Sequence, residues 1–471
     1  MALIKSISGI RGTIGGAPGA GLTPIDIVKF TYAYCATLPQ RKPQPNGTRY
    51  KVVVGKDARL SGDMVEQLVV GTLIGCGVDV VKCGFASTPT TEMAVVFAGA
   101  DGGIILTASH NPRQWNALKL LNDKGEFLTA AEGQAILDLA EREDFDFAGV
   151  DGLGTIEEED FTDKHIDAVL AMKAVDLEAI RAAGFKVVVD AVNSVGGIIM
   201  PRLLKRLGVK CICLNCEPTG EFAHNPEPLP QNLTDLSETV VREKADLGVS
   251  VDPDVDRLAF ICEDGKPFVE EYTLVSVADY LCERAEQAGE PIATVSNLSS
   301  TRALRDVTEK HGGTYYASAV GEVNVTTKMH EVGALIGGEG NGGVIYPALH
   351  TGRDAMAGVA LFLSNLAHKK MTVSQLKATY PQYAIAKNRI ELADKALIDR
   401  ILDALKARYA AEDVNTIDGV KISFESERKW VHLRRSNTEP IIRIYAEAPT
   451  LEGAEALAQE VIGVAEGIIR A

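Results

Sequence analysis

The chain has no long hydrophobic run, few cysteines and a deficit of basic residues. No stretch of about 18 consecutive apolar residues occurs, and Met1–Ser6 lacks the apolar core of a signal peptide, so we expect a cytoplasmic protein with no membrane partner. A net charge of −16 argues against a nucleic-acid partner, which needs a broad basic surface. An anionic small substrate would therefore need a local basic pocket.

The eight cysteines are too sparse for a disulfide scaffold, and we expect them to be thiols. Cys211, Cys213 and Cys216 lie close enough in sequence to suggest zinc. However, Cys211 and Cys213 fall in a strand-like run whose period of two puts them on one face, and no fourth ligand follows at zinc-finger spacing. We predict a structural role for them.

The length of 471 residues predicts three or four domains, at roughly 100–200 residues each. Three segments repeat a strand, a loop, a helix and a strand, which predicts largely parallel mixed sheets with helices on both faces. These segments begin at Lys51, Lys186 and Ile292, and the acidic stretch 144–160 is interpreted as a linker with its flanking helix. After about Ser374, helical patterns over 395–409 and 452–469 enclose strand-like runs over 419–424 and 441–445.

A short apolar run, Gly102–Leu106, ends in the hexapeptide Thr107–Pro112, which contains Ser109. This pattern predicts a buried strand that delivers Ser109 to an exposed loop tip, where a nucleophile or a phosphate carrier is expected. An ordinary strand-to-loop turn is the alternative. Ten residues after Ser109, the ammonium group of Lys119 interrupts an apolar pattern.

Asp252, Asp254 and Asp256 directly follow another apolar run. Three carboxylates at this spacing repel one another, so their assembly calls for a cation, and oxygen-only ligands suit Mg²⁺. A calcium EF-hand would place Glu263 at its twelfth position, but Arg257 stands where that loop needs glycine and the flanks have strand patterns. A solvated acidic loop is the remaining alternative.

The run Gly338–Gly343 matches the glycine spacing of dinucleotide-binding loops, yet the following Val344–Pro347 cannot open the required helix. Glu339 and Asn341 in this run suit sugar hydroxyls, with a plain tight turn as the alternative. A fourth segment, Arg434–Pro440, combines guanidinium, hydroxyl and amide groups. It suits an oxyanion, and a solvated surface turn is its alternative.

In order and spacing, these four segments resemble the α-D-phosphohexomutases, which move a phosphate between C6 and C1 of a hexose. The resemblance covers essentially the whole chain. It implies an α/β fold of three similar mixed-sheet domains plus a smaller C-terminal α+β domain around a central cleft. The expected domains carry the phosphoserine, metal, sugar and phosphate loops, and they span residues 1–150, 151–262, 263–373 and 374–471.

The resemblance also implies roles for individual residues. Ser109 carries the phosphoryl group and joins the three aspartates as a Mg²⁺ ligand, while Lys119 acts as the general base. The groups that assist at the reacting phosphate are Arg11, His110 and Arg257; the sugar contacts are Glu339 and Asn341; and the distal phosphate contacts are Arg434, Ser436, Asn437 and Thr438. We expect Arg11 and Arg257 to lower the pKa of Lys119.

The implied activity is that of an isomerase, an intramolecular phosphotransferase with Mg²⁺ as cofactor and a hexose 1,6-bisphosphate as activator. Phosphoglucosamine mutase is the first expectation, followed by phosphomannomutase/phosphoglucomutase and then a metal-dependent sugar phosphatase. A binding protein for sugar phosphate or Ca²⁺ is a further class. Asn341 and Gly343 replace the serine and histidine of the commoner bacterial loop, so the sugar loop is similar to archaeal-type members and the preferred hexose stays open, as does the oligomeric state.

Overall fold

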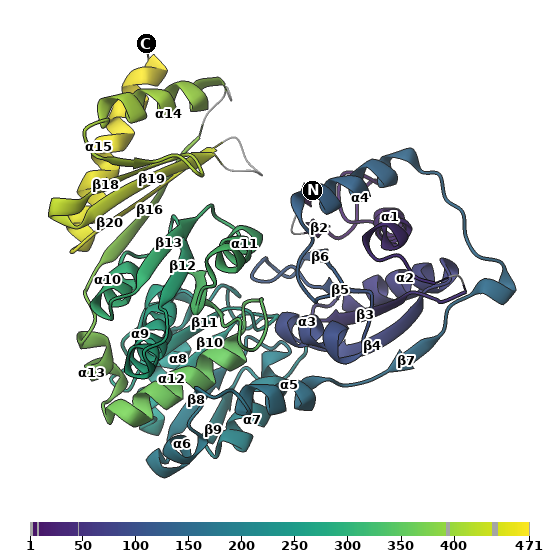
Figure 1. Cartoon of the computed structure of the whole chain (residues 1–471), viewed down its shortest axis with the longest axis horizontal. Helices are drawn as coiled ribbons and strands as arrows, with labels where there is room; N and C mark the ends of the chain where they lie inside the picture. Colours follow the sequence, from purple (N-terminus) through teal and green to yellow (C-terminus); the bar gives the residue numbers. More distant parts are fainter. Residues whose placement is uncertain (1–2, 7–8, 46, 392–395, 436–440, 471) are drawn as a thin grey trace. The chain divides into compact units, whose positions relative to one another are not determined.

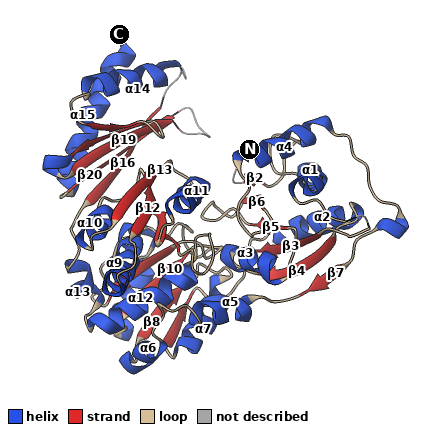
Figure 2. Cartoon of the chain, viewed as in Figure 1, coloured by secondary structure: helices blue, strands red, loops and turns tan. Residues whose placement is uncertain are grey.

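The computed structural model describes residues 3–6, 9–45, 47–391, 396–435 and 441–470 (Figures 1 and 2). The chain forms two compact units. Unit 1 consists of Met1–Thr273 and Gly342–Ser374, and unit 2 consists of Leu274–Asn341 and Gln375–Ala471.

The first sheet of unit 1 is mixed and runs in the order β1-β2-β6-β5-β3-β4-β7. Strands β5, β3, β4 and β7 are parallel neighbours, whereas β1, β2, β6 and β5 pair antiparallel. The strands are β1 (Leu3–Ser6), β2 (Gly9–Thr13), β3 (Lys51–Lys56), β4 (Asp79–Phe85), β5 (Gly102–Leu106), β6 (Trp115–Leu121) and β7 (Ile156–Glu158). The helices are α1 (Pro24–Arg41), α2 (Gly62–Gly75), α3 (Thr88–Phe97), α4 (Ala130–Arg142) and α5 (Thr162–Leu170), with a 3-10 turn at Val150–Gly152.

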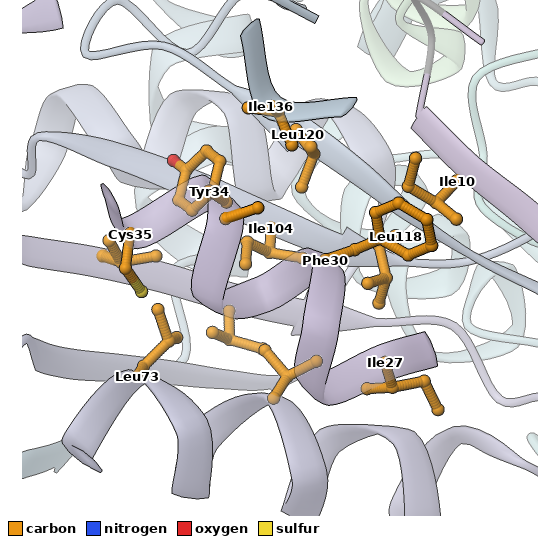
Figure 3. Close-up of a cluster of buried hydrophobic side chains, with 14 of the residues drawn as sticks. Ile10, Ile27, Phe30, Tyr34, Cys35, Leu73, Ile104, Leu118, Leu120 and Ile136 are labelled. Atoms are coloured by element: carbon orange, nitrogen blue, oxygen red, sulfur yellow. The ribbon is translucent and has the colours of Figure 1, made fainter. Parts of the chain in front are cut away.

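Both faces of this sheet are covered, as its apolar strands require. One face packs against α1, α2 and α4 through the hydrophobic cluster that Figure 3 shows. Its labelled members include Phe30 and Tyr34 from α1, Leu73 from α2 and Ile104 from β5. Side chains of α3 cover the opposite face, where Val53 and Ile105 point.

The second sheet of unit 1 is also mixed, in the order β11-β10-β8-β9, with β11 antiparallel and the others parallel. Helix α12 contacts β11, and Phe362 of α12 stacks on Phe260 of β11 with 3.9 Å between ring centroids. The remaining elements of unit 1 are α6 (Leu177–Ala183), β8 (Lys186–Asp190), α7 (Gly196–Leu207), β9 (Lys210–Leu214), α8 (Thr234–Glu243), β10 (Leu247–Val251), β11 (Leu258–Cys262), β15 (Gly343–Ile345) and α12 (Ala355–Lys369), with a 3-10 turn at Pro230–Asn232; β15 is not part of this second sheet.

In unit 2, β12 pairs in parallel with β13 and β14, and a separate antiparallel sheet runs in the order β16-β20-β19-β18-β17. The first set of elements is α9 (Glu271–Ala288), β12 (Ala293–Asn297), α10 (Ala303–Lys310), β13 (Thr314–Ser318), α11 (Glu322–Val332) and β14 (Ile336–Glu339). The second set is α13 (Val373–Ala378), β16 (Ala384–Glu391), α14 (Ala396–Arg408), β17 (Asp413–Asn415), β18 (Val420–Phe424), β19 (Lys429–Arg435), β20 (Ile441–Ala448) and α15 (Leu451–Arg470), with a 3-10 turn at Glu425–Glu427.

The predicted fold class is confirmed, including the repeated strand–helix–strand segments and the C-terminal α+β region. The linker prediction is wrong in one respect, because the acidic stretch contains β7, which adds an edge strand beside β4. A short strand with charged residues is hard to distinguish from a loop by pattern alone. The four domain boundaries stay predictions. No helix in the described ranges has the length and apolar character needed to span a membrane.

The cluster in Figure 3 leads to a stability prediction. We expect Leu73→Ala to destabilise the first sheet by about 2–5 kcal/mol, because the buried side chain leaves a cavity among α1, α2 and β5. Leu60→Ala removes the same atoms from a side chain that is 53% exposed and should cost under about 0.5 kcal/mol. Amide hydrogen exchange of β3 and β5 in increasing urea measures both effects, and equal losses would contradict the prediction.

Candidate active site

The loop that follows β5 places Ser109 inside unit 1 rather than at an exposed tip. Ser109 is only 3% exposed, so the expectation of exposure is wrong. Its backbone adopts a left-handed conformation, with φ 49°, and its N–H donates to Thr107 Oγ1 at 3.0 Å. The Ser109 hydroxyl donates to Asp252 Oδ2 at 2.7 Å and lies 3.5 Å from His110 Nδ1. The loop after β10 therefore covers the serine, which the local pattern around Ser109 could not indicate.

A buried pair, Asp57 and Arg59, fixes the shape of this loop, and the sequence analysis missed both residues. Asp57 accepts hydrogen bonds from Thr107 Oγ1 at 2.6 Å and from Arg59 Nε at 3.0 Å. The guanidinium of Arg59 also donates to the backbone carbonyls of Ser109, Pro112 and Trp115. An arginine fork can bind several acceptors at once, so it fixes the loop's position. The pair directly follows β3, at the carboxyl end of a parallel strand. In the sequence, only this position could have indicated that Asp57 and Arg59 belong to the site.

Asp252, Asp254 and Asp256 lie between β10 and β11, and all three are fully buried. Together they offer ligand atoms within 4.8 Å of one another, which confirms that the structure brings them together. The Asp252 carboxylate accepts the backbone N–H groups of Asp256 and Arg257, each at 3.1 Å. These hydrogen-bond donors therefore oppose the mutual repulsion of the three carboxylates.

Two basic side chains contact the other aspartates. Lys119 Nζ lies 2.7 Å from Asp254 Oδ2 and 3.6 Å from Asp256 Oδ2. Arg353 Nη2 lies 2.7 Å from Asp256 Oδ2. Thr88 Oγ1 donates to Asp254 Oδ2 at 2.6 Å. Arg353 and Thr88 had no motif in the sequence to mark them.

The three aspartates have the ligand atoms that a divalent cation requires. Asp254 Oδ1 and Asp256 Oδ1 are buried and have no hydrogen-bond partner. A buried carboxylate oxygen without a hydrogen-bond partner raises the free energy of the folded state. A hard cation bound to these oxygens would remove that penalty. Burial, with the added charge of Asp254 and Asp256, raises the pKa of Asp252 well above its usual range. The EF-hand alternative fails because Glu263 accepts hydrogen bonds from Ser374 instead.

The pKa of Lys119 shifts in the direction opposite to the expectation. Burial alone would lower the pKa of Lys119, but the charges of Asp254 and Asp256 outweigh it and raise that pKa. Burial likewise opposes ionisation of Asp254, and the Lys119 ammonium reverses this and lowers the pKa of Asp254. The predicted lowering by Arg11 and Arg257 is wrong, because the nearest charges to the ammonium are carboxylates.

Arg11, His110 and Arg257 gather beside Ser109. Arg11 extends from β2 and donates to Asn111 Oδ1 at 2.9 Å, and Arg257 Nη1 lies 3.3 Å from Glu227 Oε1. Burial and the charges of Arg257 and Arg11 lower the pKa of His110 well below its usual range. Arg11 and Arg257 therefore form a positive region suited to an anion, beside an imidazole that burial and these two charges keep neutral.

The remaining predicted residues belong to unit 2. Glu339 is 5% exposed, and its Oε1 accepts a hydrogen bond from Asn297 Nδ2 at 2.8 Å, while Asn341 Nδ2 lies 3.4 Å from Glu339 Oε2. Arg434, in β19, has Nη1 4.0 Å from Asp418 Oδ2. Ser436, Asn437 and Thr438 lie outside the described residues.

Three sheets flanked by helices, an antiparallel C-terminal sheet, and a buried serine that contacts an aspartate place the chain in the α/β class, with a candidate active site in unit 1. The sequence matches the family models of all four phosphoglucomutase/phosphomannomutase domains, in order along the chain. These are α/β/α domain I over residues 3–147, domain II over 163–265, domain III over 270–383 and the C-terminal domain over 388–464. The chain belongs to the phosphoglucomutase/phosphomannomutase family.

Similar proteins cover nearly the full chain. A phosphoglucomutase/phosphomannomutase of Thermococcus kodakarensis is 35% identical over 94% of this chain and 95% of its own length. A phosphoglucosamine/phosphogalactosamine mutase of Sulfurisphaera tokodaii is 31% identical over 99% of this chain and 100% of its own. The crystal structure of a phosphoglucomutase/phosphomannomutase family protein from Burkholderia thailandensis has a TM-score of 0.83 and 26% identity, and the match covers 98% of this chain and 97% of that one.

The contact between Lys119 and Asp254 leads to a prediction about cation binding. We expect Mg²⁺ to raise the Tm of Lys119→Met more than that of the wild type, because the ammonium repels a divalent cation and occupies Asp254 Oδ2. Thermal melts in EDTA and in Mg²⁺ measure the two shifts. Lys124→Met, at an exposed position, should behave as the wild type. A smaller shift in Lys119→Met than in the wild type would contradict this interpretation.

Proposed function

We propose that this protein interconverts hexose 6-phosphates and hexose 1-phosphates through a phosphoserine at Ser109 and a hexose bisphosphate intermediate. The observation that supports it most directly is the hydrogen bond from the Ser109 hydroxyl to Asp252, within a family whose relatives are named as phosphosugar mutases. No reported relative is named as a phosphatase, so the sugar phosphatase alternative has no support.

The proposed transfer needs a carrier, a base and a charge-stabilising environment. The phosphoryl group leaves Ser109 Oγ as its P–O bond breaks, and a new P–O bond forms to a sugar hydroxyl. Lys119 takes the proton of that hydroxyl, which requires the lysine to be neutral and to leave its contact with Asp254. The second transfer, from the other end of the bisphosphate back to Ser109, reverses these roles.

Arg11, His110 and Arg257 would stabilise the negative charge that spreads over the transferring oxygens. Burial of Ser109 helps to exclude water, which would otherwise hydrolyse the phosphoserine. Because the bisphosphate must present either end to Ser109, both ends need a common distal phosphate site. We assign that site to Arg434, Ser436, Asn437 and Thr438, and the sugar contacts to Glu339 and Asn341.

Asp252, Asp254 and Asp256 would hold a Mg²⁺ ion together with an oxygen on Ser109, because hard oxygen ligands select this ion. When bound, Mg²⁺ neutralises charge on the phosphoryl oxygens. A hexose 1,6-bisphosphate would act as activator, since it can return a phosphoryl group to an unphosphorylated Ser109.

Glucosamine phosphate is the proposed preferred substrate, with phosphomannomutase/phosphoglucomutase activity as the alternative. Relatives carry both kinds of name, including a probable phosphoglucosamine mutase of Methanopyrus kandleri, 32% identical over 88% of this chain. Glycine at 343 gives the sugar loop one side chain fewer to contact C2, so discrimination at C2 should be only about 10–200-fold.

The carrier role predicts that Ser109→Ala lowers mutase turnover by several orders of magnitude, because the covalent relay is lost rather than one hydrogen bond. Intact mass spectrometry should find one phosphate on the wild type after incubation with a hexose 1,6-bisphosphate, and none on the variant. Ser237→Ala, on the partly exposed surface of α8, is the matched control and should retain both properties. Turnover of Ser109→Ala within tenfold of the wild type would refute the proposal.

The substrate proposal predicts the highest kcat/KM for glucosamine phosphate, with measurable turnover of glucose and mannose phosphates. Weak contact at C2 should keep the three values within about 10–200-fold of one another. Side-by-side kinetics on one preparation decide the order. If glucosamine 6-phosphate is the poorest substrate by more than about a hundredfold, the alternative activity takes its place.

A further inference from the structure

A second cluster of metal-ligating side chains lies in unit 1 and has no part in the proposed reaction. His165 of α5, His350 and Asp354 bring ligand atoms within 4.8 Å of one another. His165 Nε2 lies 2.9 Å from Asp354 Oδ2, and His350 Nε2 lies 3.3 Å from the same oxygen. His165 and Asp354 are at most 1% exposed, and the His350 side chain is 13% exposed.

The opposite nitrogen of each imidazole ring lies near an oxygen of helix α3. His165 Nδ1 lies 3.0 Å from Thr90 Oγ1, and His350 Nδ1 lies 3.5 Å from Glu92 Oε2. Glycine at 352 permits this approach, because a Cβ there would lie 2.0 Å from Glu92 Oε2. An Nδ1–H that donates to a hydroxyl or a carboxylate leaves the Nε2 lone pair directed at the cluster, which is the arrangement found around histidines that bind metals.

Asp354 is also fixed on its other side. It is the N-cap of α12, and its Oδ1 accepts the backbone N–H groups of Met356 and Ala357 at 2.8 and 3.2 Å. Oδ2 is thereby directed at the two histidines. The three ligand atoms are thus held by packing and by hydrogen bonds, in a site that is already assembled.

We propose that His165, His350 and Asp354 bind a transition-metal ion of the Zn²⁺ type. Two imidazole nitrogens and one carboxylate oxygen select such an ion over Mg²⁺, which prefers oxygen ligands. Metal–ligand bonds of about 2.0 Å in a tetrahedron place ligand atoms about 3.3 Å apart, close to the observed separations from Asp354 Oδ2. Water supplies the fourth ligand, and the ion replaces the protons that otherwise lie between each Nε2 and Asp354.

The position of the cluster indicates a supporting role for the ion. Helix α3 supplies Thr88 to the aspartate site and Thr90 and Glu92 to the histidine cluster. Arg353, which contacts Asp256, is adjacent to Asp354. A bound ion would therefore fix two segments that also contact Asp254 and Asp256, without touching the substrate.

Metal content tests the proposal. Full-length protein is stripped with a chelator, incubated with Zn²⁺ in excess Mg²⁺, desalted and analysed by inductively coupled plasma mass spectrometry. We expect about one zinc per wild-type chain, because Mg²⁺ competes only for the aspartates. His350→Gln should retain at most about a tenth of the zinc that the wild type retains, and zinc should no longer raise its Tm.

Two controls separate this site from others. His368→Gln changes a histidine whose side chain is 43% exposed, and it should retain zinc as the wild type does. Asp252→Asn alters the aspartate site and should also retain zinc. Failure of the wild type to retain zinc, equal retention by His350→Gln, or loss of zinc in Asp252→Asn would each overturn the proposal.

If His350→Gln does not fold, X-ray absorption of the zinc-loaded wild type gives an independent answer. Two imidazole ligands with oxygen neighbours at about 2.0–2.2 Å would support the site. A shell of oxygen atoms alone, or one containing sulfur from the cysteines around Cys213, would overturn it.

Discussion

Three buried carboxylates in one short loop impose the constraint on which the active-site region depends. Asp252, Asp254 and Asp256 cannot stay together in a dry environment unless positive charge and hydrogen-bond donors oppose their repulsion. These groups come from distant parts of unit 1. Lys119 comes from β6, Thr88 from the start of α3, and Arg353 from the segment before α12. The same contacts that satisfy the aspartates therefore join the first sheet to the second.

The topology explains why these groups can meet. Ser109 follows β5 and the aspartates follow β10, and both strands are parallel to a neighbour in their own sheet. In α/β folds the loops at the carboxyl ends of parallel strands form the ligand sites. Two such edges face each other here, since Ser109 Oγ reaches Asp252 across 143 positions of the sequence. The fold thus brings the candidate phosphate carrier and the candidate cation site together.

The sequence was sufficient where the information was local. Apolar runs such as Gly102–Leu106 predicted buried strands, which the structure confirms, and the spacing of the three aspartates predicted that their carboxylates come together, as they do. The sequence was insufficient where a property depends on contacts between distant segments. Arg59 belongs to no motif, and the pKa of Lys119 is raised by Asp254, 135 positions away. Ser109 looked exposed because no local pattern reveals that a second loop covers it. The roles of the sugar and phosphate loops of unit 2 stay predictions, and Ser436, Asn437 and Thr438 lie outside the described residues.

The charge balance at the aspartates bears on the proposed role of Lys119 as general base. Lys119 and Arg353 supply two positive charges to three carboxylates, so the cluster keeps the lysine protonated. A base must instead be neutral. When another cation balances Asp254, the carboxylate attraction that raises the pKa of Lys119 weakens, while burial, which favours the neutral amine, stays. As the proposed base, Lys119 would then release its proton once a cation is bound, so the charges that oppose the repulsion of the aspartates would also control the proton of this lysine.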